Sequence, residues 1–295
     1  MELFGVPLSA LLGQIMLGLV NGAFYAVLSL GLAIIFGLLR IVNFAHGAFF
    51  MVGAFVALIL GRYLGIGYWV ALLIAPVVVA VTGIIFERFL LRRIYGLDPI
   101  YGLLLTFGLV LVLEGLFRVG FGSSGQSYNT PAELRGVWNL GFMILPIYRA
   151  FVIGIAIVIC VATWFVIEKT RIGSQLRAAT ERPDLTRAFG INVPLLLTLT
   201  YGAGVGLAAF AGVLAAPIQH VNPSMGSDLV IVVFAIVVIG GLGSIFGSAV
   251  TGLGLGVIEG LTKVFYSEAS TTVVFLLMAL ILLLRPAGLF GREEG

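Results

Sequence analysis

Residues 8–38 read LSALLGQIMLGLVNGAFYAVLSLGLAIIFGL, and this stretch holds no charged side chain. About 20 apolar residues are enough for a helix to cross a bilayer. The stretch therefore predicts a membrane helix that is long enough to be tilted, or to be broken near Asn21 and Gly22. A transmembrane β-barrel instead shows weak alternating segments of about 10 residues, so this sequence favours a helical membrane protein.

The composition of the whole chain indicates the same class. Of its 295 residues, 61% are hydrophobic and only 10% are charged, which is more apolar surface than a water-soluble core needs. The net charge of +3 does not indicate a nucleic-acid partner, because the basic residues are thinly spread and flank apolar runs. The single cysteine, Cys160, lies inside an apolar run and excludes an intrachain disulfide.

The expected fold is all-α, a polytopic transmembrane helical bundle formed as a single domain over residues 1–295. The stretch 240–247, GGLGSIFG, is a candidate re-entrant turn. Because this stretch and the long segment 8–38 leave the exact number of crossings open, the sequence predicts eight to ten spans in contact with the lipid bilayer. We expect them near residues 8–38, 44–61, 68–90, 99–121, 146–167, 194–216, 228–242, 247–266 and 271–285.

The basic residues predict the orientation, because lysine and arginine gather in cytoplasmic loops. Eleven of the 16 fall on one side if the connections after 38, 90, 167, 242 and 285 share that side. They are Arg40, Arg88, Arg92, Arg93, Lys169, Arg171, Arg177, Arg182, Arg187, Arg285 and Arg292. We therefore expect an outside N-terminus, a cytoplasmic C-terminus, a cytoplasmic loop at about 169–193, and a long outer loop at about 122–146.

Motifs for catalysis and nucleotide binding are absent from the sequence. It has no G-x-x-x-x-G-K-[ST], no H-E-x-x-H and no G-x-S-x-G, and its two histidines are too few for a multi-histidine metal site. We expect neither an enzyme, nor a metal or cofactor site, nor ATP bound by this chain itself.

Four polar residues stand out inside or beside the spans as candidates for a translocation path or gate: Asn43, His46, Glu114 and Glu259. An ionisable residue at membrane depth is costly and is a functional candidate by default. In an ion-driven carrier the two glutamates would be coupling sites. Alternatively, each is hydrogen-bonded to a neighbouring helix or lies near the wet outer surface. Asn43 either caps the helix that follows it or belongs to the gate.

Gly252, Gly256 and Gly260 are spaced four residues apart. This spacing places them on one face of a helix, where they allow a neighbouring backbone to approach closely. The same span contains Glu259, so it should be sheltered by other helices.

One segment near the middle of the chain is polar. Residues 177–192, RAATERPDLTRAFGIN, hold five charged side chains. Pro183 fits the first turn of a helix, and Asp184 suits the positive end of its dipole. Gly190 is a natural stop. The sequence predicts a two-turn helix over 183–189.

Leu185, Ala188 and Phe189 would share one face of this short helix. A helix of two turns is marginal alone and needs a surface to pack against. It is either an amphipathic linker that lies on the bilayer, or a helix that docks in a groove of a cytoplasmic partner.

The chain resembles the LivH type of permease subunit from ATP-binding-cassette importers of branched-chain amino acids. The similarity runs nearly end to end, and its most specific parts are near the two ends. The stretches that carry it are GLVNGAFYAVLSLGLAIIFGLLRIVNFAHGAFFMVGAF (18–55), GSQLRAATERPDLTRAFGIN (173–192), VIGGLGSIFGSAVTG (238–252) and LRPAGLFG (284–291).

The resemblance implies a permease domain in a bacterial inner membrane. It also implies a second related permease of the LivM type, two cytoplasmic ATPase subunits and a periplasmic substrate-binding protein. Residues 178–191 would form the coupling helix, although Ala178 follows Arg177 where the general E-A-A-x3-G motif has glutamate. The coupling residues would be Arg182, Asp184, Leu185, Arg187, Phe189 and Gly190.

Three functions remain open at this point. An apolar pathway with few charges favours a hydrophobic zwitterion such as leucine. The same family includes permeases that resemble urea and short-chain amide importers. A stand-alone secondary carrier that uses Glu114 and Glu259 is the third alternative.

Overall fold

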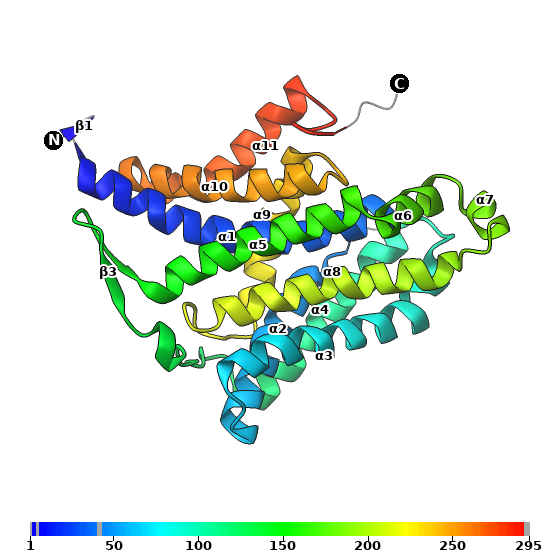
Figure 1. The fold of residues 1–295 in the computed structure, drawn as a ribbon, viewed down its shortest axis with the longest axis horizontal. Coiled ribbons are helices and arrows are strands. Elements are labelled where there is room, and N and C mark those ends of the chain that lie inside the picture. Colours follow the sequence, from blue (N-terminus) through cyan, green and yellow to red (C-terminus); the bar gives the residue numbers. More distant parts are fainter. Residues whose placement is uncertain (1, 4–5, 40–42, 292–295) are drawn as a thin grey trace.

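The architecture is given by a computed structural model, which describes residues 2–3, 6–39 and 43–291. Helices account for most of it (Figure 1). They are α1 Leu8–Leu39, α2 Ala45–Leu64, α3 Tyr68–Phe89, α4 Pro99–Phe121, α5 Ile147–Lys169, α6 Arg171–Glu181, α7 Pro183–Ala188, α8 Val193–Ala215, α9 Met225–Gly240, α10 Ile245–Phe265 and α11 Thr272–Leu284. Three 3-10 helices join them, η1 Leu91–Ile94, η2 Ala132–Leu134 and η3 Ser267–Ala269.

Strands form only two short antiparallel pairs in the described part of the chain. β1 Glu2–Leu3 pairs with β2 Val6–Pro7, and β3 Val137–Asn139 pairs with β4 Ile144–Pro146. The prediction of an all-α membrane bundle is therefore confirmed.

Seven helices in the described residues are long and apolar enough to cross a membrane: α1, α2, α3 with η1, α4, α5, α8 and α10. Two shorter apolar helices, α9 and α11, add to them. α1 has 32 residues and runs unbroken past Asn21 and Gly22. At about 1.5 Å per residue it is about 48 Å long, so it must tilt to fit a hydrocarbon core of about 30 Å.

The stretch 240–247 forms the connection between α9 and α10 and the first turn of α10. Gly241 (φ +100°) and Gly243 (φ +82°) adopt the left-handed conformations that let the chain reverse. The carbonyl groups of Ile239 and Gly240 accept hydrogen bonds from the amides of Leu289 and Phe290, at 2.8 and 3.2 Å. The segment after α11 thus covers the end of α9.

α1 forms the centre of the core. It packs chiefly against α10 and α8, and α8 in turn packs against α2 and α3 (Figure 1). The outer helices expose large apolar side chains, among them Leu73 of α3, Val119 of α4 and Leu283 of α11. Such a surface suits acyl chains and would be a liability in water.

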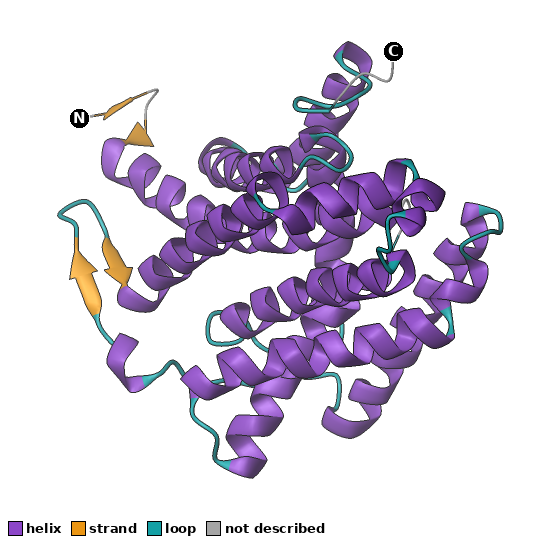
Figure 2. Cartoon of the chain, turned by 45° about the vertical axis from the view of Figure 1, so that its right-hand side comes forward, coloured by secondary structure: helices purple, strands orange, loops and turns teal. Residues whose placement is uncertain are grey.

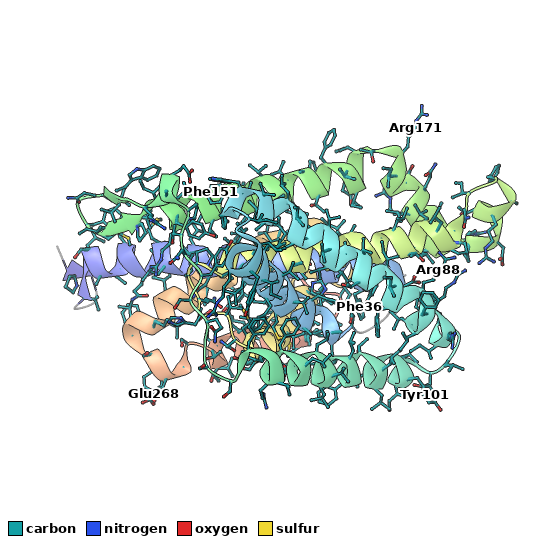
Figure 3. The ribbon with its side chains drawn as sticks, turned by 90° about the horizontal axis from the view of Figure 1, so that it is seen from below. Phe36, Arg88, Tyr101, Phe151, Arg171 and Glu268 are labelled. Atoms are coloured by element: carbon teal, nitrogen blue, oxygen red, sulfur yellow. The ribbon has the colours of Figure 1, made fainter. Side chains whose placement is uncertain are left out.

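The two ends of the bundle differ. α6 and α7 lie at one end, which we call the α7 end, and the β3–β4 hairpin lies at the other, the hairpin end (Figures 1 and 2). Figure 3 shows Arg88 and Arg171 toward the α7 end and Glu268 toward the hairpin end.

Candidate functional site

A sharp turn after α5 places the polar segment at the α7 end. α6 starts directly after α5, and Gly173 lies against the backbone of Ile167, where a side chain would collide. Arg177 donates a hydrogen bond to the Ile167 carbonyl at 2.8 Å and pairs with Glu168 at 3.5 Å. The basic side chain thus attaches α6 to the end of α5.

α7 starts at the residue that the sequence predicted, and the predicted stop residue follows its end. Pro183 is its first residue, Asp184 lies in its first turn, and Gly190 follows in the left-handed conformation (φ +82°). The helix ends at Ala188, one residue earlier than expected, because Phe189 already leaves helical geometry. Asp184 pairs with Arg187 at 3.4 Å.

The apolar side chains of α7 face outward. Leu185 is 50% exposed and Phe189 is 82% exposed. Ala188 and Arg182 are also exposed, whereas Thr186 is the buried residue of the helix. The structure therefore presents two large apolar groups beside charged ones at the tip of the bundle.

The candidate gate residues Asn43 and His46 are fully buried. The Asn43 amide donates to the Tyr201 hydroxyl of α8 at 3.1 Å, and α2 has no side-chain cap. The alternative that Asn43 caps this helix is therefore wrong, because the side chain turns inward instead. A ring nitrogen of His46 lies 2.9 Å from the Leu28 carbonyl of α1. These contacts connect the start of α2 to α8 and α1.

Sequence reasoning missed a buried carboxylate. Glu87, near the end of α3, is 1% exposed and accepts hydrogen bonds from the hydroxyls of Tyr95 (2.6 Å) and Thr198 (2.7 Å). Burial, together with the bond to Glu87, raises the pKa of Tyr95. Glu87 looks like an ordinary flanking charge in the sequence, and its partner on α8 is 111 residues away.

The two membrane glutamates have different surroundings. Glu259 is 6% exposed and accepts hydrogen bonds from the Tyr25 hydroxyl (2.8 Å) and from Lys263 (2.6 Å). Glu114 is half-buried on α4, which packs against α2, whereas Glu259 lies on α10 against α1. No hydrogen bond or ion pair to Glu114 occurs within the described residues.

The three glycines of α10 lie on the face that meets α1. A Cβ added at Gly256 would collide with the backbone of Gly18, and one at Gly252 would lie 2.7 Å from Ala26. A Cβ at Gly260 would also meet the backbone of α1. The backbones of the two helices are therefore in direct contact.

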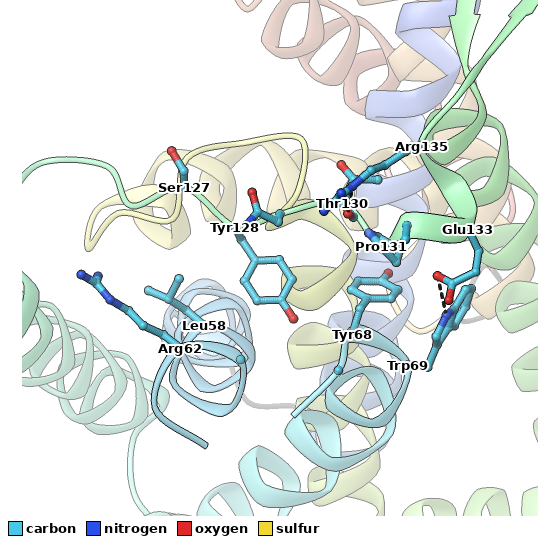
Figure 4. Close-up of a pocket in the computed structure, with 14 residues that line it drawn as sticks. Leu58, Arg62, Tyr68, Trp69, Ser127, Tyr128, Thr130, Pro131, Glu133 and Arg135 are labelled. Atoms are coloured by element: carbon cyan, nitrogen blue, oxygen red, sulfur yellow. Dashed lines mark hydrogen bonds between the residues drawn. The ribbon is translucent and has the colours of Figure 1, made fainter. Parts of the chain in front are cut away.

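A pocket of about 570 Å³ lies at the hairpin end, between the end of α2, the start of α3 and the outer loop (Figure 4). The indole nitrogen of Trp69 donates to Glu133 at 3.3 Å, and Nε of Arg135 donates to the Thr130 carbonyl at 2.9 Å. The sequence predicted only a long outer loop at about 122–146. No local motif marks the pocket, because its walls come from three separate segments.

The family profile described as "Branched-chain amino acid transport system / permease component" matches residues 14–284. The chain belongs to this family. The resemblance drawn from the sequence is thus confirmed. With seven long apolar helices in the part that the structure describes, the chain is a multi-pass membrane protein and a transport permease component.

Named relatives cover nearly the whole chain. It is 29% identical to the permease protein BraD of Pseudomonas aeruginosa and to LivH of Escherichia coli K12, with 96% of both chains covered in each comparison. It is 28% identical to LivM of Escherichia coli K12, over 90% of this chain and 67% of LivM. All three are named as permease proteins of high-affinity branched-chain amino acid transport systems. No solved structure matches the chain.

LivH and LivM of Escherichia coli carry the same system name, and the chain is similar to both. This indicates a system in which two related permeases form a pair.

Proposed function

We propose that the chain is a permease subunit of an ATP-driven importer that moves branched-chain, hydrophobic amino acids across the inner membrane. It works with a second related permease, two cytoplasmic ATPase subunits and a periplasmic binding protein. The observation that supports this most directly is Phe189, which is 82% exposed beside charged residues at the tip of the bundle. A large apolar side chain in that position gains free energy when it leaves water, as it would in a groove on an ATPase subunit.

The α7 end faces the cytoplasm in this proposal. Arg88, Arg171 and Arg177 lie near this end, and cytoplasmic loops carry the excess of basic residues. α1 begins at the hairpin end, so the N-terminus is outside (Figure 1). In this proposal the short apolar helices α9 and α11 cross the membrane together with the seven long helices of the described residues, which places the C-terminus in the cytoplasm.

α7 is the coupling helix of the proposed importer. Leu185 and Phe189 enter a groove on an ATPase subunit, and Arg182, Asp184 and Arg187 set the charge at its rim. Gly190 ends the helix so that the chain can return to α8.

Movement of α7 reaches the membrane through α6. Because Arg177 attaches α6 to the end of α5, a displacement of α7 shifts α5 with it. The approach of two ATPase subunits would then rotate the two permeases and switch access from one side to the other.

Co-purification and reconstituted uptake test this function. The chain should purify with its ATPase subunits, and proteoliposomes supplied with ATP and the binding protein should accumulate leucine and valine. Uptake of urea or acetamide in their place would support the amide alternative. Uptake by this chain alone, driven by an ion gradient and abolished by Glu114→Gln or Glu259→Gln, would support a secondary carrier and overturn the proposal.

A further inference from the structure

The pocket at the hairpin end combines charges of both signs with aromatic rings. Its lining includes Glu133, Arg135 and the rings of Tyr68, Trp69 and Tyr128. Its volume of about 570 Å³ falls within the range of about 300 to 1,000 Å³ that is typical of small-molecule sites.

One side of the pocket suits a cationic group. The Glu133 carboxylate faces the indole of Trp69, which already donates to it (Figure 4). The rings of Tyr68 and Trp69 meet edge to face, with their centroids 5.4 Å apart, and the Tyr128 ring lies 6.4 Å from that of Tyr68. A carboxylate beside several aromatic rings attracts an ammonium group by charge and by cation–π interaction.

Arg135 supplies the complementary charge. Its Nε is engaged by the Thr130 carbonyl, and no acidic partner of Arg135 occurs within the described residues. The two terminal nitrogens are therefore available to a carboxylate, which a guanidinium binds through two parallel hydrogen bonds. Arg62 lies at the opposite side of the pocket and donates to Gln126 at 3.2 Å (Figure 4).

The walls of the pocket are held in place. Gln126 and Val221 exchange two backbone hydrogen bonds, of 2.8 and 2.9 Å, which attach the loop to the segment after α8. The Tyr68 and Tyr148 hydroxyls lie 2.9 Å apart, and Tyr148 donates to the Leu214 carbonyl. Leu58 and Pro131 add apolar surface to the lining. A site whose groups are already positioned loses less entropy when it binds a ligand.

We infer that this pocket is a receiving site for one zwitterionic amino acid on the permease itself. Glu133 and the rings of Tyr68 and Trp69 take the ammonium group, Arg135 takes the carboxylate, and the apolar surface takes the side chain. The inference rests on the proposed function, and it identifies the cargo as a zwitterion, because urea and neutral amides carry neither charge that the pocket would pair.

Trp69 provides a direct reporter of binding. The full chain, carrying Trp138→Phe and Trp164→Phe so that Trp69 is the remaining tryptophan, is placed in lipid nanodiscs and titrated while its emission is followed. The ligands are leucine, 4-methylpentanoate (which lacks the ammonium), 3-methylbutylamine (which lacks the carboxylate) and urea. Leucine should change the emission saturably, and each single-charge analogue should bind about ten-fold more weakly or worse.

Two variants test which charged group of the ligand each pocket residue binds. Glu133→Gln should weaken leucine binding by about ten-fold while 4-methylpentanoate binding is retained, and Arg135→Gln should do the same while 3-methylbutylamine binding is retained. The matched controls are Glu268→Gln and Arg118→Gln, two exposed charges that do not line the pocket. Both should bind leucine like the parent.

Equal affinity for leucine and its single-charge analogues, or unchanged leucine affinity in both pocket variants, would overturn the inference. Parallel uptake measurements separate it from the proposed function. If the reconstituted importer accumulates leucine while Trp69 does not respond to it, the receiving site is refuted and the importer function stands.

Discussion

The guanidinium of Arg177 on α6 lies 3.5 Å from the carboxylate of Glu168 on α5. The same guanidinium donates to the backbone carbonyl of Ile167 at 2.8 Å. These contacts join the polar segment to a membrane helix. Arg177 can therefore affect both the transmission of motion from α7 to α5 and the stability of the fold, and the two effects are measured separately.

Arg177→Gln should reduce uptake per ATP hydrolysed, because α6 is no longer attached firmly to α5. Both partners of the ion pair are partly exposed, so losing the pair itself should cost no more than about 1 kcal/mol in the free energy of unfolding. Parallel ATPase and uptake assays on the reconstituted complex measure the ratio. Arg171→Gln, at an exposed arginine at the start of the same helix, is the matched control. An unchanged ratio in Arg177→Gln would show that α6 does not transmit the motion.

Phe189→Ala should weaken the association with the ATPase subunit without affecting membrane insertion. Burial of a phenylalanine side chain contributes about 1.5 to 3 kcal/mol, which corresponds to a loss of affinity of about ten-fold or more. Co-purification at graded protein concentrations measures this, and ATP hydrolysis should no longer be coupled to uptake. Leu283→Ala removes an equally exposed apolar side chain (83%) from α11 and should leave the association unchanged. Full coupling in Phe189→Ala would rule out the proposed role of α7.

Gly256→Ala should destabilise the bundle, because the added methyl collides with the backbone of α1 at Gly18 and Gly22. Overpacking of this kind typically costs about 1 to 3 kcal/mol, and rigid backbone on both sides leaves little room for adjustment. Thermal unfolding in detergent measures the effect. Gly254→Ala on the same helix is the control, since its Cβ would meet no atom within 4 Å. Equal melting temperatures for the two variants would show that α1 and α10 can move apart at little cost, so that their close backbone contact does not limit stability.

Local patterns in the sequence were sufficient to predict where the membrane helices lie and which residues bound α7. The apolar runs marked the spans because a membrane helix satisfies its own backbone, so its position depends on local hydrophobicity. Pro183 and Gly190 marked the ends of α7 because both act through their own backbone geometry.

The contacts of the candidate site could not be predicted from local sequence patterns. The hydrogen bond between Asn43 and Tyr201 joins residues 158 positions apart, and it takes the place of the local helix cap that was one of the two alternatives for Asn43. The pocket at the hairpin end likewise depends on how the outer loop folds over α2 and α3. Pairings of this kind depend on helix packing, which hydrophobic patterns do not specify.

The hydrogen bond from Tyr95 to buried Glu87 predicts how the stability of the protein changes at alkaline pH. Burial and this bond raise the pKa of Tyr95 in the folded protein above its unfolded value of about 10. The unfolded chain therefore loses this proton first, and the stabilisation is complete below pH about 10 and is lost as the pH rises further. Tyr95→Phe should flatten this part of the decline when melting temperatures are measured between about pH 8 and 11. Tyr101→Phe, at an exposed position on α4, should decline like the parent protein. If Tyr95→Phe loses stability above pH 10 as steeply as the parent, the Tyr95 hydroxyl does not contribute to the alkaline transition.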